Sequence, residues 1–314
     1  MTDLDVLALG SALVELTPTD LGASLRAADR YEALSSGATA NFCVALAKLG
    51  TRVALATRVG DDELGQWLRS KLSSYGVDMS LALPVEGQLT PVSFCWMDQD
   101  GAKTFYFYRF PGYSDPMAAF GRQPLADADL RRARLFDFSE ATVRAEPLRS
   151  LSLSLASRAR ALGLQVCYAL NYRADSWREP LATVVTVQRQ ALALADIAVM
   201  NREEAALVTG TEDLSAEALL DLGPSLVAVT SGAEGAWIAA PGLWEHLPAR
   251  PVEVRYDIGA GDTFHAGLVA GLLRGLAPKE AARCAACAAA LRICRTADMS
   301  CLPSWEEVAA LAAD

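Results

Sequence analysis

The sequence predicts an α/β fold in which helices cover both faces of a mostly parallel β-sheet, with a small second β-sheet beside it. The first observation is that short apolar runs ending in Gly or Asn alternate with longer amphipathic segments. Such alternation is typical of βαβ units and a parallel sheet. The second observation is that two stretches, 11–36 and 91–112, break the alternation. The first lacks a helical stripe, and the second carries two β-rich runs.

The elements of the large sheet are predicted in order along the chain. Strands are expected at residues 6–9, 53–57, 135–138, 165–169, 197–200 and 226–230. Helices are expected at residues 40–49, 64–75, 148–162, 184–194, 203–209 and 265–273. Gly76 and Gly163 directly follow two of these helices, as is common at helix C-termini. Because ligands of such sheets lie beyond the carboxyl ends of the strands, functional residues are expected there.

The stretch 91–112 predicts a β-hairpin. Its β-rich runs, 92–97 and 104–108, are joined by Asp98-Gln99-Asp100-Gly101, which is a typical hairpin turn sequence. The sequence shows no low-complexity linker and no internal repeat. We therefore expect one α/β domain over residues 1–314, with a small sheet formed by about 11–36 and 91–112.

The composition restricts the classes of partner. The chain has 314 residues, of which 52% are hydrophobic, and its 28 basic and 38 acidic residues give a net charge of −10. This charge argues against nucleic acid or an anionic membrane as the main partner. No apolar run approaches the roughly 20 residues that span a bilayer. The N-terminus, Met1-Thr2-Asp3-Leu4-Asp5, is acidic where a signal peptide is basic. We expect a cytoplasmic protein.

The seven cysteines do not predict a metal or disulfide framework. Cys284 and Cys287 form a Cys-x-x-Cys pair, but no second close pair completes a zinc site. Their offsets place Cys284, Cys287 and Cys294 near one face of an Ala-rich helix, which favours buried thiols. The odd number of cysteines fits a reducing compartment.

The segment Gly259-Ala260-Gly261-Asp262 predicts an anion-binding turn at the start of a helix. Backbone N–H groups at a helix N-terminus lack acceptors, and the helix dipole adds positive potential. A carboxylate repels phosphate, so Asp262 is expected to face an attacking group and accept its proton. The alternative is an ordinary helix with an acidic first turn. His265, in the next turn, is expected to be a packing residue or polar neighbour.

Two motifs resemble those of the ribokinase-like (PfkB) sugar kinases. The segment 259–264 is similar to the family's GAGD signature, and Ser36-Gly37-Ala38-Thr39-Ala40-Asn41 is similar to its N-terminal signature. The motifs lie over 200 residues apart in the family's order, and further matches extend over essentially the whole chain. The resemblance implies a ribokinase-like three-layer α/β/α fold in which the small β-sheet is a lid over the sugar. It also implies that Gly259, Ala260 and Gly261 act with Asp262 in catalysis.

The resemblance implies which residues bind the sugar. Gly37 and Asn41 would contact sugar hydroxyls, although a helix cap also explains Asn41. Glu15 lies near the position where the family often has a sugar-binding Asp, and an exposed lid glutamate is the alternative.

Two arginines are further candidates for substrate contact. Arg109 resembles the lid arginine of fructokinases and 2-keto-3-deoxygluconate kinases, which reaches the sugar or the transferred phosphate. A solvated edge-strand arginine is the alternative. Asn171, Arg173 and Trp177 match an Asp-Pro-Asn-x-Arg-x-x-x-Trp segment of the same subfamilies, but Ala169 replaces the aspartate.

The nucleotide side is implied by two other segments. Asn201-Arg202-Glu203-Glu204 resembles the family's Asn-x-x-Glu, which implies that Asn201 and Glu204 act near Mg²⁺ and the phosphates of ATP. One such carboxylate acting through water, Glu204, is sufficient for hydrated Mg²⁺. An ordinary capped helix is the alternative. The segment 230–235 is similar to the loop that lies against ATP, which implies contacts from Thr230, Gly232 and Gly235.

One departure concerns a monovalent cation. Many family members have an Asp that helps to hold this cation where the present chain has Tyr256, and Ile258 also departs from the pattern. These differences argue against a family-type potassium site, although Asp257 could partly replace the missing ligand.

Together these features predict ATP- and Mg²⁺-dependent phosphorylation of a primary sugar hydroxyl. The segments 135–138 and 146–150 resemble fructokinases more closely, which favours a neutral ketohexose. A 2-keto-3-deoxygluconate kinase is the alternative, because Arg109 and Arg173 would also bind a carboxylate. Neither a P-loop nor a Gly-x-Gly-x-x-Gly after the first strand is present.

Two further expectations concern activity and assembly. Because Ala169 and Tyr256 replace acids of the family pattern, a catalytically poor sugar- or nucleotide-sensing protein on the same scaffold is an alternative of a different class. An exposed edge of the small sheet would allow a homodimer to form through the lid.

Overall fold

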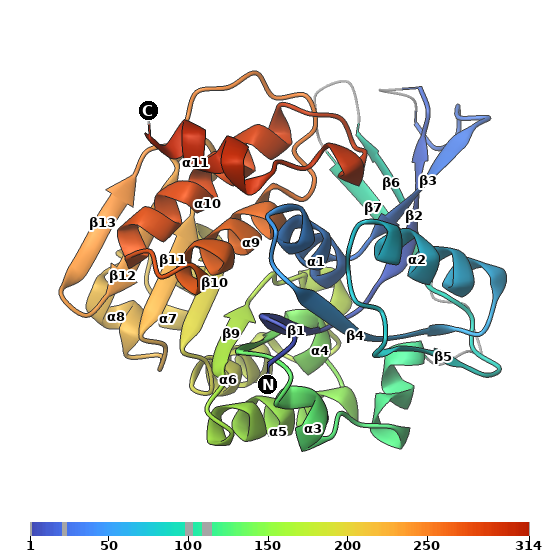
Figure 1. Cartoon of the computed structure of the whole chain (residues 1–314), viewed down its shortest axis with the longest axis horizontal. Helices are drawn as coiled ribbons and strands as arrows, with labels where there is room; N and C mark the ends of the chain where they lie inside the picture. Colours follow the sequence, from blue (N-terminus) through green and yellow to red (C-terminus); the bar gives the residue numbers. More distant parts are fainter. Residues whose placement is uncertain (1, 21–23, 98–102, 109–114, 314) are drawn as a thin grey trace.

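The computed structural model describes residues 2–20, 24–97, 103–108 and 115–313. Within these residues, nine strands form a large sheet and four strands form a small one (Figure 1). The strand order is β13-β12-β11-β10-β9-β8-β1-β4-β5 in the large sheet and β3-β2-β6-β7 in the small sheet.

The strands and helices have the following bounds. The large sheet contains β1 (Val6–Leu9), β4 (Val53–Gly60), β5 (Ala82–Val85), β8 (Leu135–Ser139), β9 (Gln165–Ala169), β10 (Ile197–Asn201), β11 (Leu226–Thr230), β12 (Ala236–Ala240) and β13 (Leu243–Leu247). The small sheet contains β2 (Leu13–Pro18), β3 (Tyr31–Ser36), β6 (Val92–Met97) and β7 (Lys103–Tyr108). The helices are α1 (Ala38–Lys48), α2 (Glu63–Ser74), α3 (Asp127–Leu130), α4 (Glu140–Val143), α5 (Leu148–Ala161), α6 (Leu181–Leu192), α7 (Arg202–Thr209), α8 (Ala216–Leu220), α9 (Ala260–Leu273), α10 (Pro278–Ile293) and α11 (Trp305–Ala313).

The large sheet is parallel from β11 to β5, and only β12 and β13 pair in antiparallel fashion. The chain runs from β1 outward to β4 and β5, and then returns to the other side of β1 at β8. The connection that follows β1 therefore runs toward one edge of the sheet, and the connection that follows β8 runs toward the other edge. Ligands of open α/β sheets bind outside the strand ends at such a reversal.

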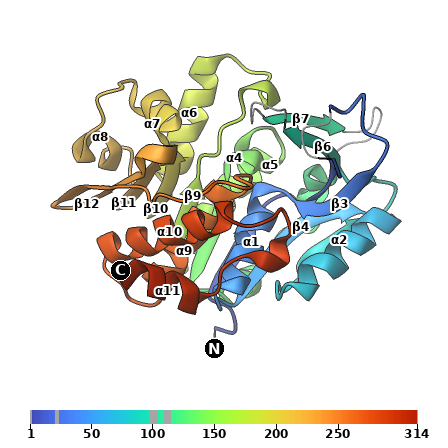
Figure 2. The ribbon, with the colours of Figure 1, turned by 90° about the horizontal axis from the view of Figure 1, so that it is seen from above.

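Helices cover both faces of the large sheet, as Figure 2 shows from above. One core lies under α1, α2, α9, α10 and α11, and the other lies under α5, α6, α7 and α8. Alternate residues of a strand point to opposite faces. Val6 and Ala8 of β1 accordingly join the first core, and Leu7 and Leu9 join the second. The three-layer α/β/α fold predicted from the sequence is confirmed.

The small sheet is built from the two stretches that interrupt the α/β alternation. Strands β2 and β3 pair within 11–36, β6 and β7 pair within 91–112, and β2 joins β6 in parallel. The sheet lies next to α1 and α2 (Figure 1). The predicted turn at 98–101 lies outside the described residues.

The start of α1 differs from the sequence prediction. The helix begins at Ala38, and its N-cap is Gly37, whose φ is 112°. The explanation of Asn41 as a helix cap is therefore wrong, because Asn41 lies inside the first turn. Its side chain is available for a contact outside the helix.

The buried thiols and the absence of a disulfide agree with the sequence analysis. The cysteines of the described residues form no disulfide, and Cys284 and Cys287 are buried on α10, whereas Cys294 at the end of the helix is partly exposed. Among the residues that the structure describes, no helix is both long and apolar enough to cross a bilayer.

Helices α9 and α10 approach each other closely along a line of small residues. A Cβ atom placed on Gly267 would lie 2.8 Å from the Cα of Ala285, and one on Gly271 would lie 3.0 Å from the Cα of Ala281. The backbone of α10 cannot move away as a flexible side chain could. The absence of a side chain at Gly267 therefore sets the position of α9.

We predict that Gly267→Ala lowers the free energy of unfolding by about 1–3 kcal/mol, which is typical of overpacking a core. The clash opposes the better helix propensity of Ala. Urea denaturation measures the change. Gly121→Ala is the control, because a Cβ atom there meets no atom within 4 Å and the backbone is not left-handed. Equal stability of the two variants would contradict the packing assigned to α9 and α10.

Candidate active site

The turn that opens α9 presents free backbone amides. Gly259 is the N-cap with a left-handed φ of 82°. The amide of Ala260 donates to the Asp257 carbonyl at 3.2 Å, and that of Thr263 donates to the Gly259 carbonyl at 2.9 Å. The amides of Gly261 and Asp262 donate to no acceptor among the described residues. This is the arrangement that binds anions at helix N-termini.

Asp262 is held in place by a residue from the other end of the chain. The side-chain amide of Asn41 on α1 donates to Asp262 Oδ2 at 2.9 Å. The other carboxylate oxygen accepts no hydrogen bond from the described residues. Burial raises the pKa of Asp262 above its ordinary value, while the Asn41 hydrogen bond and the charge of Arg173 lower it. The carboxylate is thus oriented, partly desolvated and able to accept a proton.

A cavity of about 200 Å³ lies in front of this carboxylate. It is walled by the last residues of four neighbouring strands, namely Ser139 of β8, Ala169 of β9, Asn201 of β10 and Thr230 of β11. The other lining residues are Ala38, Thr39, Phe42, Asp137, Asn171, Arg173, Val199, Met200, Glu204, Gly261, Asp262 and His265. The cavity lies at the carboxyl ends of the parallel strands, where ligands of this fold class bind.

The structure brings six of the sequence-derived candidates into this wall: Arg173, Asn201, Glu204, Thr230, Gly261 and Asp262. Four other candidates do not line the cavity but lie next to residues that do. Gly37, Asn41 and Ala260 each directly precede a lining residue, and Gly259 precedes Gly261 by two positions. Gly232 and Gly235 lie farther along, around the 3₁₀ turn Gly232–Glu234, and do not line the cavity. Arg109 lies outside the described residues.

Glu15 and Gly37 lie where the small sheet meets α1. Glu15 is only 3% exposed, so the alternative of an exposed lid glutamate is wrong. Ser36 Oγ donates to Glu15 Oε2 at 3.0 Å. Burial raises the pKa of Glu15, and the nearby negative charge of Asp262 raises it further. A Cβ atom on Gly37 would lie 2.7 Å from the Ser11 carbonyl oxygen, so only glycine fits there.

The segment after β9 supplies a cationic side chain to the cavity. Asn171 has a positive φ of 40°, which is uncommon for a residue with a side chain. Arg173 is exposed and donates from Nη1 to the Tyr172 carbonyl at 3.1 Å. Its charge lowers the pKa of both Asp262 and Glu204. At Ala169 the wall has a methyl group where the family pattern has a carboxylate.

Asn201 and Glu204 form a reciprocal capping box at the start of α7. Asn201 Oδ1 accepts from the Glu204 amide at 2.8 Å, and Glu204 Oε2 accepts from the Asn201 amide at 2.8 Å. Glu204 Oε1 accepts from the Tyr172 amide at 2.7 Å. Burial raises the pKa of Glu204, and these backbone hydrogen bonds oppose that effect. The predicted alternative of a capped helix is therefore confirmed. The cap still leaves a lone pair on each oxygen of Glu204 that a water molecule can use.

Three polar residues that line the cavity were not singled out as site residues from the sequence, namely Asp137, Ser139 and His265. His265 Nε2 lies 3.1 Å from Asp137 Oδ1 and 3.2 Å from Cys167 Sγ, and its ring stacks on Phe42 at 4.0 Å. The Ser139 hydroxyl has no partner among the described residues. An aspartate within the otherwise apolar run 135–138 was a signal in the sequence, because buried carboxylates need a reason.

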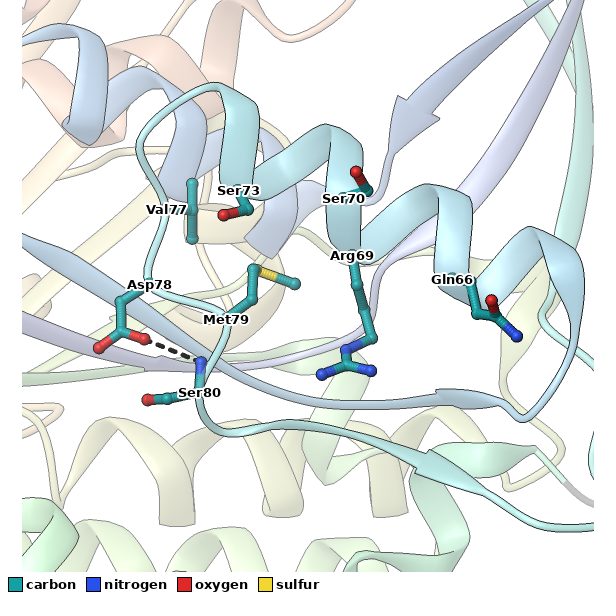
Figure 3. Close-up of a pocket in the computed structure, with 8 residues that line it drawn as sticks. All are labelled: Gln66, Arg69, Ser70, Ser73, Val77, Asp78, Met79 and Ser80. Carbon is teal, nitrogen blue, oxygen red and sulfur yellow. Dashed lines mark hydrogen bonds between the residues drawn. The ribbon is translucent and has the colours of Figure 1, made fainter.

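A larger but open hollow of about 550 Å³ lies elsewhere, between α2 and the segment before β5. Figure 3 shows its lining residues, among them Arg69, Asp78 and Ser80. Asp78 accepts a hydrogen bond from the Ser80 amide at 2.8 Å and pairs with Arg132. None of the candidate residues lies there, so the smaller cavity at the strand ends is the candidate active site.

Comparisons with known proteins place the chain in a family. The family described as pfkB family carbohydrate kinase matches residues 3–305. The fructokinase of Klebsiella pneumoniae is 33% identical over 267 residues, which are 84% of this chain and 83% of that protein. The 5-dehydro-2-deoxygluconokinase of Shouchella clausii is 26% identical over 316 residues, which are 98% of this chain and 95% of that protein.

Solved structures share the whole fold. A PfkB protein from a Polaromonas species has a TM-score of 0.85 at 26% identity, over 98% of this chain and 99% of that chain. A fructokinase with bound ATP from Xylella fastidiosa has a TM-score of 0.86 at 23% identity, over 98% and 97% of the two chains. The family match, the relatives and the geometry at the start of α9 show that the chain belongs to the pfkB family of carbohydrate kinases.

Proposed function

We propose that this carbohydrate kinase transfers the γ-phosphoryl group of ATP to a primary hydroxyl of a neutral ketohexose such as fructose. The observation that carries the proposal is the carboxylate of Asp262 beside the free amides of the α9 N-terminus, at the mouth of a sugar-sized cavity. A proton acceptor next to an anion site is what attack by a hydroxyl on a phosphoryl group requires.

The proposed chemical step uses Asp262 as the general base. The sugar hydroxyl donates its proton to the carboxylate while its oxygen attacks the γ-phosphorus, and the bond from phosphorus to the bridging oxygen of ADP breaks. The amides of Gly261 and Asp262, with the flanking Gly259 and Ala260, stabilise the charge on the transferred phosphoryl group. Asn41 keeps the carboxylate turned toward the hydroxyl through its 2.9 Å hydrogen bond.

Glu204 is the residue proposed to hold Mg²⁺, through a water molecule. Both of its oxygens already accept backbone hydrogen bonds, so direct coordination would compete with the cap of α7. The remaining lone pairs fit a hydrated ion, which Mg²⁺ prefers to remain. When bound, the ion would neutralise phosphate charge. Asn201 and Thr230 would lie on the same, nucleotide side of the cavity, and Gly232 and Gly235 would shape the loop that follows.

The small sheet is proposed to be the lid over the sugar. Glu15 and Gly37 lie at its base, and in the proposal they contact the sugar together with Asn41. Closing the lid would exclude water, which otherwise competes with the sugar as a nucleophile. Arg109, which lies outside the described residues, is proposed to contact the sugar or the transferred phosphate.

The lid also offers a surface for a second subunit. Edge strand β7 exposes Phe105, Tyr106, Phe107 and Tyr108, each with 39–56% of its surface accessible. An exposed aromatic edge strand invites pairing, and we propose a homodimer formed through the lids. A cytoplasmic location and the absence of nucleic-acid or membrane partners stay predictions from the acidic composition.

A keto-deoxy sugar acid is the second candidate substrate. Arg173 lines the cavity and, among the described residues, donates only to the neighbouring Tyr172 carbonyl, so its guanidinium can bind a substrate carboxylate. The relative from Shouchella clausii, named a 5-dehydro-2-deoxygluconokinase, also favours this alternative.

We predict that fructose gives the highest kcat/KM among fructose, 2-keto-3-deoxygluconate, ribose and adenosine in a coupled ADP-release assay. Higher kcat/KM for 2-keto-3-deoxygluconate would instead identify the sugar acid as the substrate. Calorimetric binding of a sugar without any ADP release would favour the sensing alternative and contradict the proposed catalysis.

We predict that Asp262→Asn lowers kcat by about 10²–10⁴-fold, the usual contribution of a general base, while the sugar still binds in calorimetry. The amide keeps the shape of the side chain but accepts a proton poorly. Asp221→Asn is the control, since Asp221 is an exposed carboxylate at the end of α8. Near-normal turnover by Asp262→Asn would remove the proposed base.

We predict an acid limb in the pH profile of kcat/KM whose apparent pKa lies above the ordinary value of Asp, because burial raises the pKa of Asp262. Activity is present above this pKa and is lost as the pH falls through it. Asn41→Ala removes a hydrogen bond that favours the charged form, so the limb should move to higher pH. A limb that is unchanged or moves to lower pH in Asn41→Ala would show that another group controls it.

A further inference from the structure

Arg292 lies buried directly behind the phosphate-binding turn. It belongs to the last turn of α10 and is 2% exposed. Its Nη1 donates to the Thr296 carbonyl at 2.6 Å, and its guanidinium lies over the ring of Tyr256, 4.9 Å from the ring centre. A Cβ atom on Gly259 would be 3.7 Å from Arg292 Nε. The cation therefore stands between the segment before α9 and the segment after α10.

The guanidinium is not neutralised by a close carboxylate. Among the described residues it forms no ion pair with a carboxylate, and its Nε has no hydrogen-bond acceptor. Burying an ion without a partner is costly. The cost is offset by the negative end of α10, by the face of the Tyr256 ring and by the more distant carboxylates of Asp262 and Asp257. An arginine buried at this cost is expected to have a function.

The same residues leave no fitting site for a monovalent cation. The amides of Arg255 and Tyr256 donate to the Ile293 carbonyl at 2.7 and 3.1 Å, which ties the two segments together. Tyr256, whose side chain is buried, stands where many family members have an acid that helps to hold the ion. A carboxylate ligand is thus absent at this position, and a guanidinium would repel a second cation.

We propose that Arg292 replaces the monovalent cation of the family as a built-in positive charge behind the phosphate-binding turn, so that phosphoryl transfer does not depend on K⁺. The inference rests on the proposed function of this turn. Arg292 is a positioning residue, because it acts on the turn and contacts no substrate. Its charge adds to the potential of the α9 N-terminus and fixes the loop that presents the amides of Gly261 and Asp262.

The first test compares the wild-type enzyme in KCl, NaCl and tetramethylammonium chloride at equal ionic strength. Turnover of the best sugar substrate should agree within about twofold among the three salts, since no cation binding is coupled to catalysis. The midpoint of thermal unfolding, with and without a non-hydrolysable ATP analogue, should also be the same, because an ion that binds the folded state would raise it.

The second test removes the guanidinium. Arg292→Ala should lower kcat/KM by roughly tenfold or more, and millimolar guanidinium or K⁺ should restore part of the loss. Arg292→Lys, which keeps a charge, should retain more activity than Arg292→Ala. Arg295→Ala is the matched control, since Arg295 lies in the same segment but pairs with Glu307 away from the turn. Circular dichroism checks that each variant is folded.

Three results would overturn the inference. They are a tenfold loss of wild-type turnover without K⁺, a wild-type unfolding midpoint that rises specifically with K⁺, and a folded Arg292→Ala variant with wild-type kinetics. If Arg292→Ala does not fold, the wild-type comparisons and Arg292→Lys decide. If no sugar in the panel is phosphorylated, the thermal measurement still tests the cation site, so failure of the proposed function is distinguished from failure of this inference.

Discussion

The proposed chemistry depends on one constraint: the carboxylate of Asp262 is held at the positive end of α9 without a paired cation. Asn41 achieves this with a neutral hydrogen bond across 221 residues of sequence. An arginine or lysine in the same position would stabilise the charged form and lower the proton affinity that a general base needs. A neutral amide orients the carboxylate and changes its basicity less. The packing of α1 and α9 on one face of the sheet, set by close glycine contacts with α10, keeps this geometry.

The large elements were predictable from sequence because local pattern determines them. Strands predicted at 6–9, 92–97, 165–169 and 226–230 match the structure, and the other predicted strands differ by one to three residues at one end. The start of α1 was not predicted, because a glycine with positive φ serves as its N-cap in place of a polar side chain. Local pattern allowed Asn41 to be the cap, whereas in the folded structure its side chain donates to Asp262.

The candidate site was only partly accessible to sequence reasoning. Motifs located Asp262, Glu204 and Arg173, because each lies at a strand end or helix start that the pattern identifies. Asp137 interrupts an apolar run, which signals a buried carboxylate but does not assign it to a site, and Arg292 lies in an Ala-rich segment that carries no such signal. Their neighbours, His265 and Tyr256, come from distant parts of the chain. Only the folded arrangement shows that these side chains lie near the turn that opens α9.

The departures from the family pattern all reduce the negative charge around the site. Ala169 and Tyr256 each remove a carboxylate near the place where phosphate is expected, and Arg292 adds a buried cation behind the same turn. A chain with a net charge of −10 must gather positive potential locally to bind ATP. In the proposal, fewer acids in the site reduce its dependence on bound cations. Glu204 is an acid that is present, and its backbone hydrogen bonds oppose the effect of burial on its pKa. The charge balance of the site is therefore set by protein groups to a greater degree than the family pattern implies.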